Sequence, residues 1–109
     1  MPPVGAPPIT DAFGAIAHPV RRSLVTALAG GDNPVRELAA VVTVSRPAVS
    51  QHLAVLRGVG LVSEQRQGRE RRYHLHPERL DEVRNWMHTL DRFWDNRLDR
   101  LRRHLEENP

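Results

Sequence analysis

Cysteine and lysine are both absent from the 109 residues, and the aromatic residues are two Trp, two Phe and one Tyr. Without cysteine the chain cannot form disulfides, thiolate metal sites or iron–sulfur clusters, and it has no cysteine nucleophile. No stretch longer than about ten residues lacks a charged residue, so no segment is expected to span a membrane. No basic segment followed by an apolar run opens the sequence, so no export signal is expected. These absences predict a small cytoplasmic globular protein.

The charge is unevenly distributed along the chain. All 16 basic residues are arginines. Nine of them lie between Arg21 and His76, together with four acidic residues, whereas the part from Pro77 onward holds seven arginines and eight acidic residues. The first part is therefore basic and the second is nearly neutral. This asymmetry predicts that the first part contacts a polyanion and that the second part has another role.

Residues 1–8 contain four prolines and no charged residue, and we expect them to form a disordered N-terminal arm. Apolar residues at helical spacing then predict a first helix over 9–17, which ends at His18 because a residue before proline disfavours the α region. Pro19 suits the first turn of a second helix. Gly30-Gly31 would end that helix.

Two further helices are expected across a short turn. We expect Asn33 to cap a third helix that begins at Pro34, and Ser45 to cap a fourth helix that extends to about Arg57. Two helices joined in this way predict a helix-turn-helix. Their inward-facing residues are predicted to be Val35, Leu38, Ala39 and Val42 in the third helix, and Val49, Leu53 and Leu56 in the fourth.

The hydrophobic period then changes from that of a helix to that of a strand. Segments 61–66 and 71–76 flank the turn 67–70, which predicts a β-hairpin rich in arginine. No further glycine or proline occurs between Pro77 and Glu106, so a single helix about 40 Å long is expected there. An apolar stripe along this helix requires a partner.

We therefore predict a fold that is mainly α with a small β-hairpin, in which the long last helix requires a partner. It divides into a winged helix-turn-helix DNA-binding domain over 9–76 and a long C-terminal dimerisation helix over 77–109.

The fourth helix turns one face to the core and leaves the opposite face for double-stranded DNA. Arg46 at its start suits the O6 and N7 atoms of guanine, and Gln51 suits adenine. The small side chain of Ser50 would let the helix enter a major groove, while the helix N-terminal amides and Ser45 favour phosphate. Hairpin arginines would contact the DNA backbone or the minor groove. The predicted DNA-binding residues are Ser45, Arg46, Pro47, Ser50, Gln51, Arg66, Arg69, Arg71 and Arg72.

The sequence resembles, in order and spacing, the ArsR-type winged-helix transcriptional repressors of bacteria. The segments that carry the resemblance are AIAHPVRRSLVTALAGG, VRELAAVVTVSRPAVSQHLAVLRGVGLV and QGRERRYHL. The resemblance covers about residues 9–95 and implies a winged helix-turn-helix that is dimeric through its first and last helices. It also implies that this homodimer binds a palindromic operator, with half-sites about 34 Å apart, and excludes polymerase from the promoter. By position it implies that Arg46, Pro47, Ser50 and Gln51 contact bases. The predicted dimer interface comprises Phe13, Leu80, Val83, Trp86, Met87, Leu90, Phe93, Trp94 and Leu98.

A metal site is not predicted. Zinc and nickel sensors of the resembled family carry Asp-x-His-x10-His-x2-Glu/His on the last helix. This sequence offers Asp91, His104 and Glu107 at that spacing, but Phe93 stands where the first His is required. The tail DRFWDNRLDRLRRHLEE is similar to a subgroup whose members often lack a known metal or thiol effector. We expect no cofactor, and a metal-responsive repressor is kept as an alternative.

An enzyme is not predicted either, because the sequence contains no nucleophile elbow and no glycine-rich phosphate loop. A second alternative is a protein-interaction module that uses the long C-terminal helix. His52 lies between the inward and outward faces of the fourth helix and is expected to pack or hydrogen-bond rather than to bind a ligand. These residues leave open the operator sequence and any effector or partner protein that relieves repression.

Overall fold

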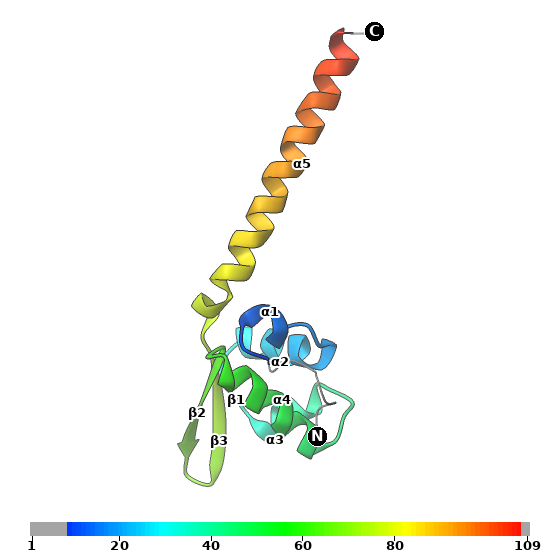
Figure 1. The fold of residues 1–109 in the computed structure, drawn as a ribbon. Coiled ribbons are helices and arrows are strands. Elements are labelled where there is room, and N and C mark those ends of the chain that lie inside the picture. Colours follow the sequence, from blue (N-terminus) through cyan, green and yellow to red (C-terminus); the bar gives the residue numbers. More distant parts are fainter. Residues whose placement is uncertain (1–8, 108–109) are drawn as a thin grey trace, which may run out of the picture.

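The computed structural model describes residues 9–107 as short helices grouped around a small sheet, from which one long helix extends (Figure 1). The disordered arm expected over residues 1–8 lies outside the described residues. The mainly helical fold with a β-hairpin is confirmed. The elements in chain order are α1 (Ala12–Ala15), α2 (Pro19–Ala29), β1 (Asn33–Pro34), α3 (Val35–Ala40), α4 (Arg46–Gly58), β2 (Val62–Gln67), β3 (Glu70–Leu75), the 3-10 helix η1 (Pro77–Leu80) and α5 (Asp81–Glu107).

The first helix is shorter than expected. The side chain of Asp11 accepts a hydrogen bond from the amide of Gly14 at 2.9 Å and caps α1, so the expected start at residue 9 is wrong. The helix also ends earlier than expected, at Ala15 and not at residue 17. His18 is non-helical, as predicted: its backbone is extended, and its Nδ1 accepts a hydrogen bond from the amide of Val20 at 3.1 Å. Pro19 then occupies the first turn of α2.

The expectation that Asn33 caps the third helix is wrong. Asn33 and Pro34 form β1, a strand at the edge of the sheet that pairs antiparallel with Tyr73 and Arg72 of β3. The Asn33 side chain donates instead to the backbone oxygens of Ala27 and Gly31, at 3.3 and 3.2 Å. As a result, α3 begins at residue 35 and its cap makes no side-chain hydrogen bond. A strand of two residues is too short to show the alternation by which strands are recognised in a sequence.

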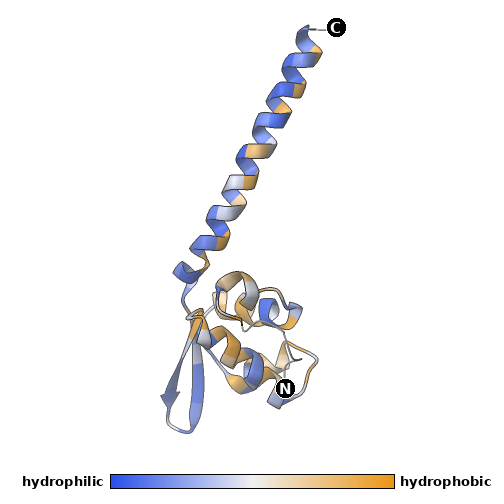
Figure 2. Ribbon diagram, viewed as in Figure 1, coloured by the Kyte–Doolittle hydropathy of each residue, from blue (hydrophilic) through white to orange (hydrophobic). Residues whose placement is uncertain are grey.

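The hairpin formed by β2, β3 and their turn, residues 62–75, is called the wing below. Its strands pair from Val62 with Leu75 to Gln67 with Glu70, so the turn is shorter than the expected 67–70. Gly68 has a φ of 64°, a conformation that costs glycine little and allows the chain to reverse within two residues. Figure 2 shows both strands of the wing as largely hydrophilic.

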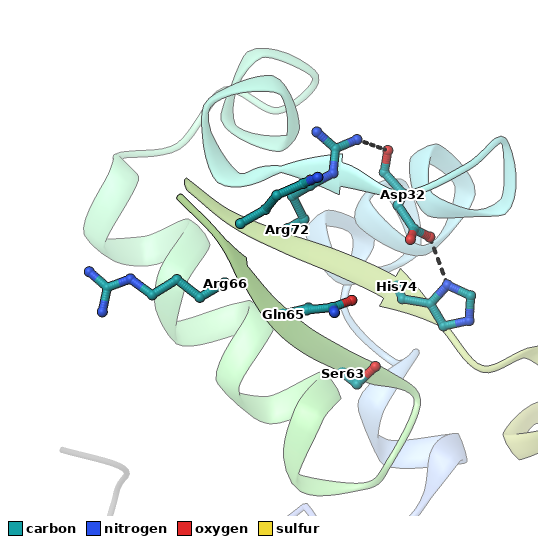
Figure 3. A pocket seen from close by; sticks show the side chains of 7 residues that line it. Asp32, Ser63, Gln65, Arg66, Arg72 and His74 are labelled. Carbon is teal, nitrogen blue, oxygen red and sulfur yellow. Dashed lines mark hydrogen bonds and ion pairs between the residues drawn. The ribbon is translucent and has the colours of Figure 1, made fainter. Parts of the chain in front are cut away.

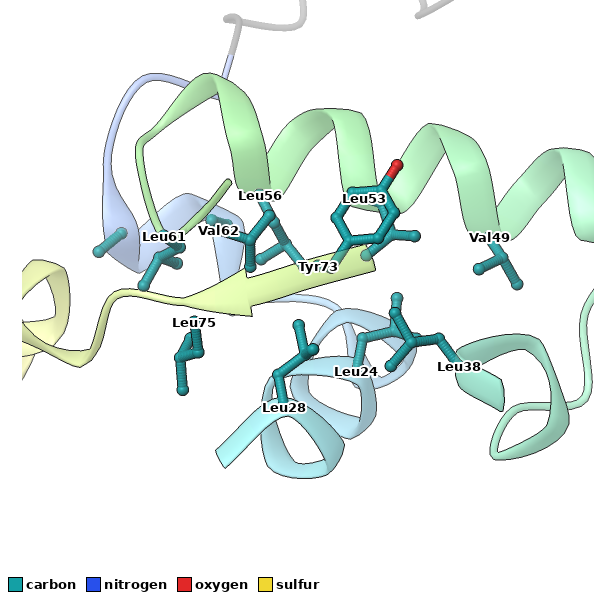
Figure 4. Close-up of a cluster of buried hydrophobic side chains, with 12 residues drawn as sticks. Leu24, Leu28, Leu38, Val49, Leu53, Leu56, Leu61, Val62, Tyr73 and Leu75 are labelled. Carbon is teal, nitrogen blue, oxygen red and sulfur yellow. The ribbon is translucent and has the colours of Figure 1, made fainter. Parts of the chain in front are cut away.

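The core lies between the short helices and the sheet (Figure 4). The inward positions predicted for the fourth helix are confirmed, because Val49, Leu53 and Leu56 are fully buried. Leu24 and Leu38, from α2 and α3, are also fully buried. Burial of each of these leucines contributes about 1.5–3 kcal/mol to folding. This core holds α4 against the sheet, so the outer face of α4 and the wing keep a defined relative position.

The long helix leaves this core almost at once. The predicted start at Pro77 is wrong, because η1 forms the first turn and α5 begins at Asp81. Only Leu80 and Val83 pack partly against the core, whereas Trp94 and Leu98 are both 60% exposed. The molecule is consequently elongated, with extents of 69 × 36 × 24 Å. Figure 2 shows apolar residues recurring along α5 among hydrophilic ones.

Two contacts join the start of α5 to α1. The rings of Phe13 and Trp86 meet edge to face with centroids 5.7 Å apart, and the amide of Ala12 donates to Glu82 Oε1 at 3.1 Å. Both aromatic rings belong to the predicted dimer interface, and they contact each other within one chain. Among residues 9–107, no helix is long and apolar enough to cross a membrane.

Candidate nucleic-acid interface

The start of α4 is exposed and oriented away from the core. Ser45 caps the helix, and its Oγ accepts a hydrogen bond from the amide of Ala48 at 3.3 Å. Arg46 is the first helical residue, and Pro47 fills a position in the first turn where its missing N–H costs nothing. Ser50 and Gln51 are exposed on the face opposite the buried residues of the helix. The surface of α4 that presents them carries no acidic residue.

The wing carries two arginines in direct register. Arg66 of β2 lies opposite Arg71 of β3, so both side chains project from the same sheet face. Like charges at opposed positions destabilise a sheet, and neither arginine forms an ion pair with a described residue. An external anion would relieve this repulsion.

Arg72 is oriented differently from the other predicted DNA-binding arginines. Because side chains alternate along a strand, it projects from the opposite sheet face to Arg71. Its Nη2 donates to the backbone oxygen of Asp32 at 3.2 Å, and the Asp32 carboxylate lies 2.7 Å from His74 Nδ1. Figure 3 shows Arg72 and His74 turned toward Asp32, with Arg66 pointing away. Arg72 and His74 thus fasten the wing to the loop that follows α2, and they line a polar pocket of about 420 Å³ on that side.

A groove of about 320 Å³ joins the wing to the start of α4 and is called the basic groove below. Arg46 from α4 lines it together with Arg69 and Arg71 from the wing, and Arg36 of α3 completes the wall. The single acidic residue that lines it, Glu70, forms an ion pair with Arg36. The fold therefore brings three of the predicted DNA-binding arginines into one cavity.

Arg36 is a residue of the basic groove that the sequence analysis missed. It lies in the first turn of α3, where the sequence shows only an exposed arginine on an amphipathic helix. Its position beside the wing depends on β1, because pairing of Asn33 with Tyr73 brings the start of α3 next to β3. No periodicity or local motif indicates that pairing.

The acidic residue near the base of the wing, Glu64, is paired with neighbouring side chains of the same chain. Glu64 Oε2 lies 3.0 Å from Arg57 Nη1 and accepts a hydrogen bond from the Tyr73 hydroxyl at 3.0 Å. Burial of the ring and the neighbouring Glu64 raise the pKa of Tyr73. Tyr73 therefore stays a neutral donor to Glu64, and the wing keeps its net positive charge.

Both the sequence and the structure of the chain are similar to those of known proteins. The family model described as bacterial regulatory protein, arsR family, matches residues 18–64. The HTH-type transcriptional regulator Rv2034 of Mycobacterium tuberculosis is 46% identical over 87 residues, which is 80% of this chain and 78% of that protein. The chain belongs to the ArsR family. The transcriptional repressor SdpR of Bacillus subtilis, another relative, is 32% identical over 90 residues, 83% of this chain and all 100% of that protein.

The chain also shares its fold with solved structures of the family. The transcriptional repressor BigR from Xylella fastidiosa has a TM-score of 0.59 and 32% sequence identity, over 72% of this chain and 80% of that one. The resemblance found in the sequence and the winged helix-turn-helix fold are thereby confirmed. Members of the family are transcriptional regulators, so the chain is a DNA-binding regulator and not an enzyme.

The candidate metal ligands named from the sequence, Asp91, His104 and Glu107, do not lie close together within one chain. Asp91 and His104 lie on the same helix, and their separation of thirteen residues corresponds to about 20 Å along its axis. A zinc ion holds its ligands at about 2 Å. In the part of the chain that the structure describes, no three His, Asp or Glu side chains are grouped so that they could hold a metal ion.

Proposed function

We propose that this ArsR chain is a homodimeric repressor that binds a palindromic double-stranded DNA operator in the cytoplasm and excludes polymerase from the promoter. The observation that carries the proposal is the basic groove, in which Arg46 of the recognition helix α4 meets Arg69 and Arg71 of the wing. Phosphates bound in this groove would lie beside the exposed face of α4 that carries Ser50 and Gln51. Backbone contacts and base contacts would then come from one continuous surface.

We assign the roles within this surface from side-chain chemistry. Arg46 and Gln51 offer the donors and acceptors that distinguish guanine and adenine in a major groove. Ser45, with the amides of the first turn of α4, favours a phosphate. Arg66 and Arg71 bind the DNA backbone from the wing, and Arg69 at the turn reaches farthest along it. Arg72 contributes mainly by holding the wing to Asp32.

The dimer is proposed from the apolar stripe of α5. Its members fall within an arc of about 80° when each residue turns the helix by 100°. Their spacing repeats every eleven residues, a period of about 3.67 residues per turn, which favours a helix pair with a slight right-handed supercoil. From Met87 onward the stripe is exposed in the single chain, whereas Val83 is half-buried against the core. Its members are Val83, Met87, Leu90, Trp94, Leu98, Leu101 and Leu105.

Two chains related by a two-fold axis would present two recognition helices. Their half-sites on DNA would lie about 34 Å apart, one helical turn. In this proposal residues 9–76 form the DNA-binding unit and α5, Asp81–Glu107, is the dimerisation helix. Relief of repression by a ligand requires two conformations, one that binds DNA and one that does not. The ligand must bind more tightly to the conformation that does not bind DNA.

The experiment that tests this function is a titration of the purified protein against a labelled duplex from its own upstream region, with excess random DNA, at two salt concentrations. We expect a dimer to protect a palindrome and to lose affinity steeply as salt is raised. Binding without preference over random duplex, even at low salt, would contradict the repressor and favour the protein-interaction module.

The variant Gln51→Ala tests base recognition in the same assay. Removal of the amide leaves phosphate contacts in place, so we expect discrimination between operators to fall by about 1–3 kcal/mol at one base pair while weak binding to random DNA persists. An equal loss on every sequence would exclude a base-reading role for Gln51.

A further inference from the structure

Arg21 of α2 is a buried cation without a carboxylate partner among the described residues. Only 8% of it is exposed, although burial of a charge is costly unless hydrogen bonds compensate. Its Nε donates to the backbone oxygen of Ala15 at 2.6 Å, and its Nη2 donates to that of Gly14 at 3.3 Å. Two arms of the guanidinium thus hold the end of α1 against α2.

The third arm reaches the recognition helix. Arg21 Nη1 lies 3.1 Å from Nδ1 of His52 in α4. Arginine has only donors, so His52 must accept with an unprotonated Nδ1 and carry its single proton on Nε2. The contact therefore exists only while His52 is neutral.

The ring of His18 also lies close to the His52 imidazole. The two ring centroids are 4.4 Å apart. Nδ1 of His18 accepts the hydrogen bond from Val20. A proton added to His52 would break the bond to Arg21 and place a second cation directly beside the Arg21 guanidinium. No described acidic side chain contacts His52 from α1, α2 or α4 to offset that charge.

The position of this cluster links two parts of the molecule with different roles. His52 directly follows Gln51, which is exposed on the DNA-facing side of α4. The other end of the cluster is α1, which contacts the start of α5 through Phe13 and Trp86 and through the amide of Ala12 with Glu82. Arg21 is the side chain that bonds to both α1 and α4.

We propose that Arg21 is a positioning residue that acts through neutral His52 to fix the recognition helix relative to α1 and the start of α5, so that discrimination between operator and random DNA requires an uncharged His52. This proposal rests on the proposed function as a DNA-binding repressor. It adds a residue that touches no DNA to the determinants of specificity and makes that specificity sensitive to acid.

The direction of the pH effect distinguishes this role from general electrostatics. Burial, then His18, then Arg21 lower the pKa of His52 from its ordinary value of 6.5, so the imidazole is neutral at neutral pH and charges only on acidification. A general gain of positive charge would instead strengthen binding to any duplex, whatever its sequence. Net charge alone therefore predicts tighter binding to both probes with unchanged discrimination, whereas the proposal predicts that discrimination is lost on acidification.

The test compares four proteins on two probes from about pH 8 to about pH 5. The probes are a duplex that the wild-type chain selects from a randomised library and a random duplex of equal length. The variants are His52→Asn, Arg21→Gln and Arg22→Gln. Asparagine places an amide oxygen near the position of Nδ1 and does not titrate. Arg22 is the matched control, because it also donates to an α1-side carbonyl, that of Ile16 at 2.8 Å, without contacting α4.

We expect the wild type and Arg22→Gln to lose discrimination on acidification, by up to about tenfold per pH unit and protomer below the pKa of His52. His52→Asn should keep the neutral-pH discrimination and lose its pH dependence. Arg21→Gln should discriminate about tenfold less than the wild type at neutral pH, the size expected for a lost hydrogen bond to a charged group. This difference should shrink on acidification, because the wild type then loses the same hydrogen bond. Identical pH profiles for the wild type and His52→Asn, or equal effects of the two arginine variants, would overturn the proposal.

Nuclear magnetic resonance of the His52 ring supplies a readout that does not depend on DNA. We expect the free wild-type protein to show the proton on Nε2, and a higher pKa of His52 in Arg21→Gln because the neighbouring cation is removed. A proton on Nδ1 at neutral pH would overturn the inference even if the protein binds its operator. Failure of the wild type to select any sequence, with the Nε2 tautomer present, would instead contradict the proposed function.

Discussion

Arg66 and Arg71 lie directly opposite each other on neighbouring strands of the wing, with no carboxylate paired to either among the described residues. The sheet tolerates this repulsion at its most exposed end, next to the groove that Arg71 lines with Arg46. An external polyanion that lies across both guanidinium groups would offset the repulsion between them.

The substitutions Arg66→Gln and Arg71→Gln should each weaken binding to operator and random duplex by a similar factor. The slope of log K against log salt should become shallower by about 0.9 for each phosphate that the variant no longer neutralises. Thermal stability should not fall, because the changes remove a like-charge repulsion. Fluorescence titrations at several salt concentrations measure the slopes. Arg100→Gln on α5 is the control of equal charge change, and an equal slope for it and the wing variants would contradict the assignment.

Glu70→Gln should strengthen binding to random DNA. The Glu70 carboxylate is the acidic group that lines the basic groove, where it pairs with Arg36. Its neutralisation frees Arg36 for a phosphate and steepens the salt slope by about 0.9 per protomer. Stability should change little, since an exposed ion pair contributes about 0–1 kcal/mol.

Glu37→Gln supplies the matched control for the previous variant. Glu37 lies on α3 next to Arg36 and does not line the groove, so the net charge changes equally in both proteins. If the two variants bind random duplex equally well, the effect comes from overall charge and not from the groove.

Leu90→Asp combined with Trp94→Asp should produce monomers that do not bind the full operator. Both residues lie on the exposed apolar stripe of α5, and carboxylates buried between two helices would remain unpaired. Sedimentation velocity measures the oligomeric state. Asn85→Asp combined with Asn96→Asp adds the same charge on the opposite face of the helix and should leave dimers intact. Dimers of the first variant would show that the stripe is not the interface.

Tyr73→Phe should lower the free energy of unfolding by about 1 kcal/mol, because the hydrogen bond to Glu64 is removed while the buried ring is kept. Burial, then the hydrogen bond and charge of Glu64, raise the pKa of Tyr73 above its ordinary value of 10.0. The neutral hydroxyl is therefore favoured in the folded state, and its contribution is complete below that value and lost as pH rises through the folded pKa. Urea unfolding at alkaline pH measures this loss. Parallel stability curves for wild type and variant would contradict it.

The helix boundaries set by local chemistry could be predicted from the sequence. The proline after His18 and the cap at Ser45 act within a few residues, so the start of α2 and of α4 follow from neighbouring residues. The start of α1 is also set by a local cap, that of Asp11 on the amide of Gly14, but the apolar pattern alone does not show it. The role of Asn33 could not be predicted locally, because its pairing with the distant Tyr73 outweighs its tendency to cap a helix.

The predicted DNA-binding residues do not all lie on one surface of the structure, and the reason is geometric. Its members on α4 share one exposed face because helical period is a local property. The arginines of the wing do not share one face, because alternation along β3 sends Arg71 toward the basic groove and Arg72 toward Asp32. The sequence shows four arginines near a turn, and only the register of β2 with β3 assigns each of them a side.

The winged helix-turn-helix, the inward face of α4 and the amphipathic stripe of α5 can all be predicted from the sequence, because periodicity and caps depend on residues within one or two helical turns. Which distant groups meet depends on the folded chain. Arg36 reaches the basic groove because β1 adds to the sheet, and Arg21 joins α1 to His52 because α2 packs between them. Contacts between residues far apart in the chain depend on how the helices and strands pack around the core, and no local sequence pattern encodes that packing.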